Sequence, residues 1–592
     1  MISIEQLRKF DTKVLCLGTH PGIIQSMLDY DYLSGKKRPS IVAIVADMRK
    51  QERYFWGEEE VAIPVAGSIK EVPRAIRNKV NTVLMVQSAR RILTGMLDAL
   101  EQLPHLQLAT IFAEKVPEQH SLEVARLAAK KNVLVVGPAS VGVLIPGVFK
   151  LGAIGGTRHP QLVKAGIMKG GDTAVISTSG GMVNELIHAV TRNGNSLSFA
   201  MALGGERYPI VAPADVFLLA EADKATKRIV YFGELGGQDE YVLADLIKKG
   251  KLTKPIIAYV AGTVSELFET PPQFGHAKAM AKNSDETAPA KKAALRAVGV
   301  TVLDSISELD TKLHHPGSRA AQDPVRNIGQ RRKHLIMSSL SGEQQDEVQL
   351  LGRDLLSTVE GNSFASLALS MLLGEQVTSK KLTDFTDYTL RLLVDHGPYQ
   401  SGAINTIVTA RAGRDLVSAL ASGLLTIGPR FGGAINGAAA AWVDGVHKTM
   451  TPKECVQKFA KLHTPIPGIG HKKYRIDLPD PRVEALIKLA PKVHRHLDFA
   501  LGVQAITVAK KGNLILNVDG TIAAVLLDLL ESELNYDYVR LKELADIEFF
   551  NAFFVVSRTI GFTSHYLDQR RHDEGLVRFG TEDIAYMPDF RS

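Results

Sequence analysis

Hydrophobic and polar positions follow two different rhythms along the chain. Through roughly the first 310 residues, short β-branched runs of strand length alternate with stretches of helical character. Alternation of this kind predicts βαβ units and parallel sheets. The runs fall into two sets that separate near residues 150–170, which predicts two doubly wound domains. They are KVLCLG, SIVAIVAD, TVLMVQ, LATIFAE and NVLVVGP, then GDTAVISTSGG, RIVYFGELGG and KPIIAYVAG.

The rhythm changes after a polar segment that spans about residues 311–335. Its sequence, TKLHHPGSRAAQDPVRNIGQRRKH, is broken by Pro and Gly and predicts a linker. The segments beyond it, such as FASLALSMLLGEQ and AAVLLDLLESEL, are rich in Ala and Leu and predict helices. The expected fold is an α/β half followed by an all-α half. We place the two α/β domains at 1–155 and 156–315, the linker at 316–345 and the helical domain at 346–592.

Composition narrows the class of protein. The 592 residues, 45% hydrophobic and 22% charged, are typical of a soluble globular protein of several domains. No stretch approaches the ~20 apolar residues that span a bilayer, and the N-terminus lacks a signal-peptide core. Cys16 and Cys455 are too few for a disulfide framework or a cysteine-rich metal site. We therefore expect a cytoplasmic protein.

The net charge of +7 bears on the ligands. Lys and Arg are spread along the chain instead of forming blocks, which argues against nucleic acid. Polyanionic small molecules, such as CoA, phosphate or a tricarboxylate, suit this distribution better.

A histidine in the first half has the surroundings of a phosphoryl acceptor. His276 lies in the loop PQFGHA after the strand KPIIAYVAG, between small residues that allow a phosphate to approach. A neutral imidazole can attack a phosphoryl group if a partner holds its opposite nitrogen, and Glu234 at another strand end is the candidate. The turn Ser179-Gly180-Gly181 offers backbone amides at a helix N-terminus, which can cradle phosphate.

Three polar islands interrupt the helical half. They are DHGP with His396, PGIGH with His471, and LNVDG with Asp519. Two histidines and an aspartate bracketed by Gly or Pro form a plausible acid–base set. The same trio could bind a metal, although its spacings match no helical or hairpin ligand pattern; we expect no metal.

The first-half motifs together resemble a known family. GELGG, the SxSGG turn and the GH loop resemble the α subunit of succinyl-CoA synthetase. QFGHA, SDETAPAKKAAL, GGERYP and WGEEEVAIPV resemble the ATP-citrate lyases more closely, over nearly all of residues 10–310. The resemblance implies that His276 is phosphorylated, that Glu234 orients it, that the Ser179 turn holds phosphate, and that a flavodoxin-like domain carries them. It also implies a Rossmann-like first domain that binds CoA. The segment Gly18–Gly22 departs from the GxGxxG fingerprint, so it gives little support to NAD binding.

The second half resembles citrate synthase in its ATP-citrate lyase branch, over about residues 345–592. The resemblance implies that Arg482, Arg558 and Arg578 grip substrate carboxylates, with Arg578 serving the neighbouring chain of a dimer. It implies an acid–base role for Asp519, enolate stabilisation by His396, and a bond from His471 to the hydroxyl that becomes a ketone. The segment GLLTIGPRFGGAINGAA is similar to the family's CoA contact. Its candidate contacts are Gly428, Pro429, Arg430 and Gly432.

The implied reaction is that of an ATP-citrate lyase, which forms citryl-CoA from citrate and CoA and cleaves it to acetyl-CoA and oxaloacetate. No ATP-grasp region or P-loop precedes the first strand, so we expect a separate ATP-grasp subunit, similar to succinyl-CoA synthetase β, to supply ATP and Mg²⁺. We also expect dimers that assemble into tetramers. The alternatives are a citryl-CoA synthetase subunit with an inactive lyase half, a CoA-sensing scaffold and a stand-alone citrate synthase.

Overall fold

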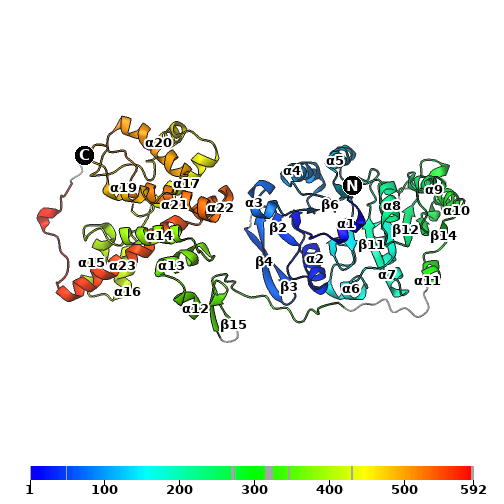
Figure 1. Ribbon diagram of the computed structural model, residues 1–592, viewed down its shortest axis with the longest axis horizontal. Helices are drawn as coiled ribbons and strands as arrows, with labels where there is room; N and C mark the ends of the chain where they lie inside the picture. Colours follow the sequence, from blue (N-terminus) through cyan, green and yellow to red (C-terminus); the bar gives the residue numbers. More distant parts are fainter. Residues whose placement is uncertain are drawn as a thin grey trace. The chain divides into compact units, whose positions relative to one another are not determined.

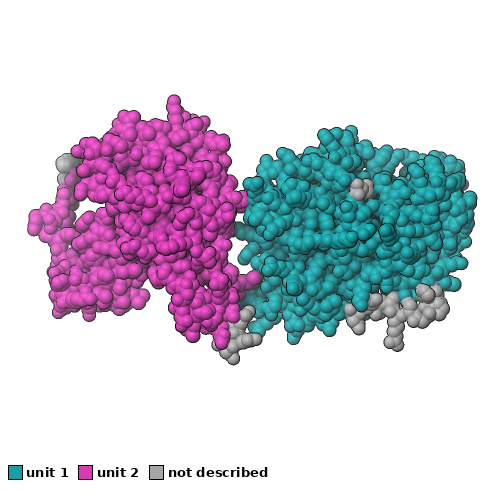
Figure 2. Space-filling model, in the orientation of Figure 1, with its two compact units in different colours: residues 1–335 teal, residues 336–592 magenta. Residues whose placement is uncertain are grey.

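The computed structural model describes residues 2–47, 50–268, 273, 275–313, 324–344, 347–428 and 431–587. The chain divides into two separately packed units, residues 1–335 and 336–592 (Figures 1 and 2). The first is α/β and the second is mostly helical, as the sequence predicts.

The first sheet of unit 1 has the strand order β3-β4-β2-β1-β5-β6-β7 and is parallel except for the edge strand β3. This confirms the Rossmann-like domain. The order reverses between β1 and β5, so the carboxyl ends of these two strands flank a crevice where ligands commonly bind. The strands are β1 (Val14–Leu17), β2 (Ile41–Val45), β3 (Gln51–Trp56), β4 (Glu59–Ala66), β5 (Thr82–Met85), β6 (Leu108–Ile111) and β7 (Leu134–Val136).

Both faces of the first sheet are covered by helices, because successive side chains of a strand point to opposite faces. In β1, Val14 and Cys16 belong to one hydrophobic cluster and Leu15 and Leu17 to another. The covering helices are α1 (Ile4–Arg8), α2 (Pro21–Leu33), α3 (Arg74–Arg77), α4 (Ile92–Gln102) and α5 (Glu118–Lys131), with the 3₁₀ turns η1 (Ile69–Glu71) and η2 (Ala89–Arg91).

The second sheet has the order β14-β13-β12-β10-β11-β8-β9. Its strands β10 to β14 are parallel and follow the flavodoxin-like order, which confirms that prediction. The antiparallel hairpin β8–β9 extends the sheet beyond β11, although it precedes the domain boundary expected at residue 155. The strands are β8 (Gly142–Ile145), β9 (Phe149–Gly152), β10 (Thr173–Ser177), β11 (Leu197–Ala202), β12 (Arg228–Glu234), β13 (Ile256–Ala261) and β14 (Thr301–Leu303).

Helices and short turns connect the strands of the second sheet. They are α6 (His159–Lys164), α7 (Gly180–Arg192), α8 (Pro213–Ala222), α9 (Asp239–Lys248), η3 (Thr263–Leu267), η4 (Ser284–Glu286), α10 (Ala288–Arg296) and α11 (Glu308–Leu313).

Part of the predicted linker lies against unit 1. We call residues 324–334 the strap. Arg331 ion-pairs with Asp29, donates from Nε to the Gly57 carbonyl at 2.9 Å and lies over the ring of Phe55. The backbone N–H of His334 donates to Glu60 at 2.6 Å. These contacts make the strap an ordered extension of the first domain.

Unit 2 is built around one helix. In α21 (Val518–Leu534), every residue from Gly520 to Leu530 is buried, so the helix is enclosed on all sides instead of having one wet face. Its neighbours include α14 (Lys380–Leu393), α17 (Ala434–His447), α19 (Pro481–Ile487) and α20 (Arg495–Lys510). The indole N–H of Trp442, a fully buried residue on α17, donates to the Gly520 carbonyl at 3.2 Å.

The remaining elements of unit 2 surround this centre. A small antiparallel sheet that the sequence did not predict comprises β15 (Ser341–Gln344), β16 (Glu347–Leu350) and β17 (Arg353–Asp354). The helices are α12 (Leu355–Glu360), α13 (Phe364–Leu373), α15 (Ser401–Arg411), α16 (Leu416–Leu424), α18 (Pro452–Lys461), α22 (Tyr538–Asp546) and α23 (Phe549–His572), followed by η5 (Thr581–Asp583). Among the described residues, no helix is both long enough and apolar enough to cross a membrane.

Replacement of Arg331 should release the strap without unfolding unit 1. Arg331→Ala removes the ion pair, the carbonyl contact and the cation–π contact at once, so the amide hydrogens of Val325, Gly329 and His334 should exchange faster. Hydrogen–deuterium exchange read by mass spectrometry checks this. The matched control is Arg332→Ala, because the neighbouring Arg332 is exposed. Unchanged exchange across the strap in Arg331→Ala would show that other contacts hold it.

Candidate functional site

The three polar islands of unit 2 meet in one pocket of about 220 Å³. His396 and His471 come from loops, and Asp519 lies in the first turn of α21, whose N-cap is Asn517. Two arginines that are distant in sequence, Arg482 on α19 and Arg558 on α23, complete the charged lining; the remaining lining residues are Leu393, Gln400, Phe431, Gly432, Asn517, Val518 and Phe554.

Asp480, which sequence reasoning missed, fixes the first arginine. Its buried carboxylate accepts bonds from Nε of Arg482 at 3.0 Å and from Nη2 at 2.7 Å. Burial opposes ionisation of Asp480, but the Arg482 bonds prevail and lower its pKa. Arg482 also lies 3.4 Å from Nδ1 of His396. The signal for Asp480 was its place at the N-cap of α19, two residues before Arg482.

The guanidinium of Arg558 is the second cation of the pocket. It is 4% exposed, stacks over the Phe554 ring and lies 3.8 Å from Asp395. Its Nε and Nη1 atoms are buried without a hydrogen-bond partner among the described residues. A buried guanidinium with unmatched donors that lines a pocket is suited to receive a carboxylate.

The histidines differ in what holds them. Nδ1 of His471 accepts the backbone N–H groups of Lys473 and Tyr474, both at 2.9 Å, so the neutral ring carries its proton on Nε2 and donates from there. Burial lowers the pKa of His471, and it lowers that of His396, where Arg482 and Arg558 act in the same direction. Both rings are therefore neutral at physiological pH.

Asp519 has the opposite shift. Burial raises its pKa to about 6, although Arg482 and Arg558 oppose the change. A carboxyl group with this pKa holds a proton and releases it near neutral pH, as an acid–base catalyst requires.

The other predicted residues of unit 2 lie in different places. Gly432 lines the pocket, and Gly428 pairs with Phe431 in the turn before it. Pro429 and Arg430 lie outside the described residues. Arg578 is exposed, follows α23 and is not among the residues that line the pocket.

The predicted histidine and glutamate of unit 1 are in contact. Nδ1 of His276 lies 2.9 Å from Oε2 and 3.1 Å from Oε1 of Glu234, which ends β12 and is buried. The hydrogen bond with Glu234 raises the pKa of His276 against the effect of burial. With Nδ1 engaged, Nε2 is the nitrogen left to react. Pro272 and Phe274 of the same loop lie outside the described residues.

Gly205, which follows β11, forms one wall for this imidazole. A Cβ on Gly205 would lie 2.2 Å from Cγ of His276, so only glycine allows the ring its position. Ser179, Gly180 and Gly181 follow β10, and Ser179 caps α7 by accepting the Met182 N–H at 3.4 Å. Because β10, β11 and β12 are neighbours and parallel, these segments emerge at one edge of the sheet.

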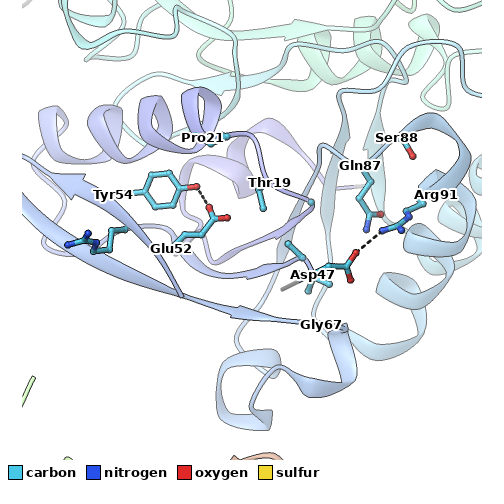
Figure 3. Close-up of a pocket in the computed structure, with 13 residues that line it drawn as sticks. Thr19, Pro21, Asp47, Glu52, Tyr54, Gly67, Gln87, Ser88 and Arg91 are labelled. Carbon is cyan, nitrogen blue, oxygen red and sulfur yellow. Dashed lines mark hydrogen bonds and ion pairs between the residues drawn. The ribbon is translucent and has the colours of Figure 1, made fainter. Parts of the chain in front are cut away.

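A larger pocket of about 720 Å³ opens at the switch point of the first sheet (Figure 3). Gly18 follows β1 and Gln87 follows β5, as expected for a ligand crevice at this point. Arg53 and Arg91 supply positive charge, and Arg91 ion-pairs with Asp47 at 3.6 Å. Sequence reasoning assigned a ligand to this domain but none of these residues; the strand ends were the available signal.

Family models match both units. The model for the C-terminal domain of citrate synthase matches residues 275–580, and the CoA-ligase model matches residues 176–301.

Individual relatives match nearly the whole chain. The probable ATP-citrate synthase subunit 1 of Neurospora crassa is 35% identical over 98% of this chain and 90% of its own length. A probable ATP-citrate synthase of Caenorhabditis elegans is 36% identical over 99% of this chain, which spans only 55% of that longer relative. The ATP citrate lyase of Methanothrix soehngenii, solved with citrate and coenzyme A, is 33% identical with a TM-score of 0.51 and 98% of both chains covered. The chain therefore belongs to the ATP-citrate synthase family, whose members are also named ATP-citrate lyases.

Proposed function

We propose that this chain is the catalytic subunit of an ATP-citrate lyase that acts together with an ATP-grasp subunit. The complex converts citrate, CoA and ATP to oxaloacetate, acetyl-CoA, ADP and phosphate. The observation that carries the proposal is the unit 2 pocket, in which His396, His471 and Asp519 converge with two arginines. A pocket with two guanidinium groups, two neutral histidines and a carboxyl group of pKa about 6 suits a carboxylate-bearing thioester.

The first half-reaction is assigned to unit 1. ATP on the partner subunit phosphorylates Nε2 of His276 while Glu234 holds Nδ1, and the amides of Ser179, Gly180 and Gly181 receive the phosphoryl group. Transfer to a citrate carboxylate gives citryl-phosphate. Attack by the CoA thiol then releases phosphate and forms citryl-CoA.

The second half-reaction is assigned to unit 2. The Asp519 carboxylate takes the proton of the citryl-CoA tertiary hydroxyl as the carbon–carbon bond breaks, which leaves oxaloacetate and the enolate of acetyl-CoA. Nε2–H of His471 bonds the oxygen that becomes the ketone, and His396 stabilises the thioester enolate oxygen. Asp519 then returns this proton to the enolate carbon. Arg482 and Arg558 hold the free carboxylates.

CoA is assigned to both units. In unit 1, the crevice of Figure 3 is lined by Gly18 and Gly67, where a ligand can approach the backbone, and by the guanidinium groups of Arg53 and Arg91. This set is suited to a phosphorylated nucleotide. In unit 2, Gly432 lines the lyase pocket and Gly428 pairs with Phe431 beside it; these glycines, with Pro429 and Arg430, are the proposed contact there.

Self-association is proposed through unit 2. Large apolar side chains are exposed on α15, α16 and α23, among them Val408, Val417 and Ile560, and others follow in the C-terminal segment, such as Phe579. Apolar exposure on this scale is typical of an interface. In a dimer, Arg578 would enter the pocket of the neighbouring chain, and pairing of dimers would give a tetramer. We also propose the domain division 1–155, 156–315, the linker 316–345 and 346–592, with the hairpin β8–β9 of the first domain reaching across to the second sheet.

The lyase assignment is tested with the purified chain and synthetic citryl-CoA. Oxaloacetate release, followed with malate dehydrogenase and NADH, should fall by about 10²–10⁴-fold in Asp519→Asn, because the amide cannot supply the proton.

The control for that experiment is Asp477→Asn, since Asp477 is an exposed aspartate outside the pocket. Its rate should equal that of the wild type. Wild-type cleavage that persists in Asp519→Asn would remove Asp519 from the mechanism. Failure of the folded wild-type chain to cleave citryl-CoA would contradict the lyase assignment itself.

The raised pKa of Asp519 has a consequence for stability. Its pKa is about 6 in the folded chain and about 3.9 in the unfolded chain, so the folded state binds more protons between these values. The stability that Asp519 contributes is thus present below pH 4 and lost as the pH rises through 6. The asparagine of Asp519→Asn does not titrate. The free energy of unfolding of this variant, relative to that of the wild type, should therefore rise by about 1–3 kcal/mol between pH 4 and pH 8.

Denaturant unfolding at both pH values measures this difference. The chain has two tryptophans, Trp56 in unit 1 and Trp442 in unit 2, so a Trp56→Phe background makes fluorescence report unit 2. An equal effect of Asp519→Asn at pH 4 and pH 8 would mean that the carboxyl group titrates normally.

Gly205→Ala should separate the two half-reactions. The added Cβ displaces the His276 ring from Glu234, so phosphorylation of His276 from labelled ATP in the reconstituted complex should slow at least about tenfold. Citryl-CoA cleavage, assigned to unit 2, should not change. Gly170→Ala is the matched control because nothing lies within 4 Å of its Cβ position. Normal phosphorylation of Gly205→Ala would show that the ring needs no such wall.

A further inference from the structure

Beneath the contact between His276 and Glu234 lies a fully buried lysine, Lys291 on α10. Its Nζ donates to the carbonyl of Glu234 at 2.8 Å, to the carbonyl of Gly236 at 2.6 Å and to Oε2 of Glu240 at 2.6 Å. An ammonium group has three N–H donors, and all three are used. The lysine is thus saturated by the backbone that carries Glu234 and by one counter-charge.

We propose that Lys291 is a positioning residue for His276: it fixes the β12–α9 turn so that the Glu234 carboxylate meets Nδ1 of the imidazole. The value of this role for catalysis rests on the proposed phosphorylation of His276. The positioning itself is a property of the folded chain and can be measured separately.

The N–H groups of Leu235 and Gly236 in this turn donate to the carbonyls of Ala261 and Glu286, whereas two of its carbonyls accept from Lys291. The turn reverses at Gly236 and Gly237, both with positive φ. These two carbonyls, those of Glu234 and Gly236, accept hydrogen bonds from the buried ammonium group of Lys291 instead of from water. Without the lysine these buried acceptors would lose a charged donor, which costs about 1–3 kcal/mol per unsatisfied group and favours a shift of the turn.

The counter-charge is itself held in place. Glu240 is 1% exposed, and its Oε1 accepts the Tyr231 hydroxyl at 2.9 Å. Tyr231 and Glu234 belong to the same strand, β12. The chain Tyr231–Glu240–Lys291 therefore links the body of β12 to the turn at its end. The opposite side of the turn packs on the His276 loop, where a Cβ on Gly236 would lie 2.0 Å from the Lys278 carbonyl oxygen.

The next residue, Lys292, allows the positioning role of Lys291 to be distinguished from the effect of burying any lysine on this helix. Lys292 is also buried and lies on the same helix, but it faces Asp304 at 3.8 Å and the ring of Tyr259. Among the described residues it makes no hydrogen bond or ion pair with the Glu234 turn, so a role specific to that turn should be found in Lys291 and not in Lys292.

The proton affinity of His276 reports on the position of Glu234. The hydrogen bond with Glu234 is the largest reason that the pKa of His276 is raised, while burial opposes it and Glu114 and Glu206 add smaller attractions. If the turn moves, that bond weakens and the pKa of His276 falls. A lysine with a purely structural role would change the stability of unit 1 but not the pKa of His276, which sets the midpoint of its pH profile.

The experiment uses the full chain and diethyl pyrocarbonate, which reacts with neutral imidazole. Mass spectrometry after digestion gives the rate at His276, whose side chain is 35% exposed, as a function of pH. The exposed His20 serves as an internal reference in every sample. The variant Glu234→Gln gives the midpoint of the His276 pH profile when the carboxylate is absent.

In Lys291→Met, the midpoint should move down by at least half of the interval between the wild type and Glu234→Gln. Lys291→Arg, which keeps a cation, should recover part of the shift, and Lys292→Met should leave the midpoint unchanged. If Lys291→Met does not fold, Glu240→Gln, which removes the counter-charge and keeps the shape, should shift the midpoint in the same direction.

A folded Lys291→Met or Glu240→Gln with the wild-type midpoint overturns the proposal, and so does an equal shift in Lys292→Met. These outcomes do not depend on phosphorylation. Failure of ATP and the partner subunit to phosphorylate His276 would instead contradict the proposed function and leave the midpoints as they are.

Discussion

The pocket of unit 2 depends on one close approach between two backbone segments. A Cβ on Gly468 would lie 2.6 Å from Cα of Gly520, and a Cβ on Gly520 would lie 2.5 Å from the Gly468 carbonyl oxygen. Hydrogen bonds join the segments on either side, from Gly470 to Ile515 at 2.7 Å and from Asn517 to Gly468 at 3.0 Å. Because His471 ends one segment and Asp519 directly precedes Gly520 in the other, this contact brings both side chains to one pocket.

Unit 1 meets the same requirement in a different way. Glu234, the partner of His276, ends β12, and the sheet itself brings Gly205 and Glu234 to one edge. The sheet does not determine how the chain turns after each strand. That is set by a buried cation beneath the turn and by a glycine against the imidazole, Lys291 and Gly205. In both units, glycine allows the approach and buried hydrogen bonds fix its direction.

Most of the architecture and much of the site could be predicted from the sequence. Strand runs gave the two parallel sheets, and motifs gave His276 with Glu234 and the three islands of unit 2, because these features are local in the chain. What the sequence did not reveal depends on distant contacts. Asp480 matters only because it holds Arg482 beside His396. The crevice residues Arg53 and Arg91 line one pocket only when the sheet places β3, β4, β2, β1 and β5 side by side. The short edge hairpins, such as β8–β9, were missed because a few residues carry too little periodicity.

The chemistry proposed for unit 2 depends on two carboxyl groups whose pKa values are moved apart: Asp519, which lines the pocket, and Asp480, which holds the pocket residue Arg482. Asp480 receives both arms of Arg482, and its pKa is lowered, so it remains a fixed anion. Arg482 and Arg558 attract the ionised form of Asp519 but do not form the paired hydrogen bonds with it that Arg482 forms with Asp480. Burial therefore prevails and raises the pKa of Asp519 to about 6. Burial, together with the arginines that would hold substrate, lowers the pKa of His396 and keeps it neutral. A carboxylate ligand would offset their charge, and the resulting loss of attraction would raise the pKa of Asp519 further. In the proposed mechanism, substrate binding would thus strengthen Asp519 as the base that takes the hydroxyl proton and holds it for the enolate carbon, which couples recognition to catalysis in one electrostatic arrangement.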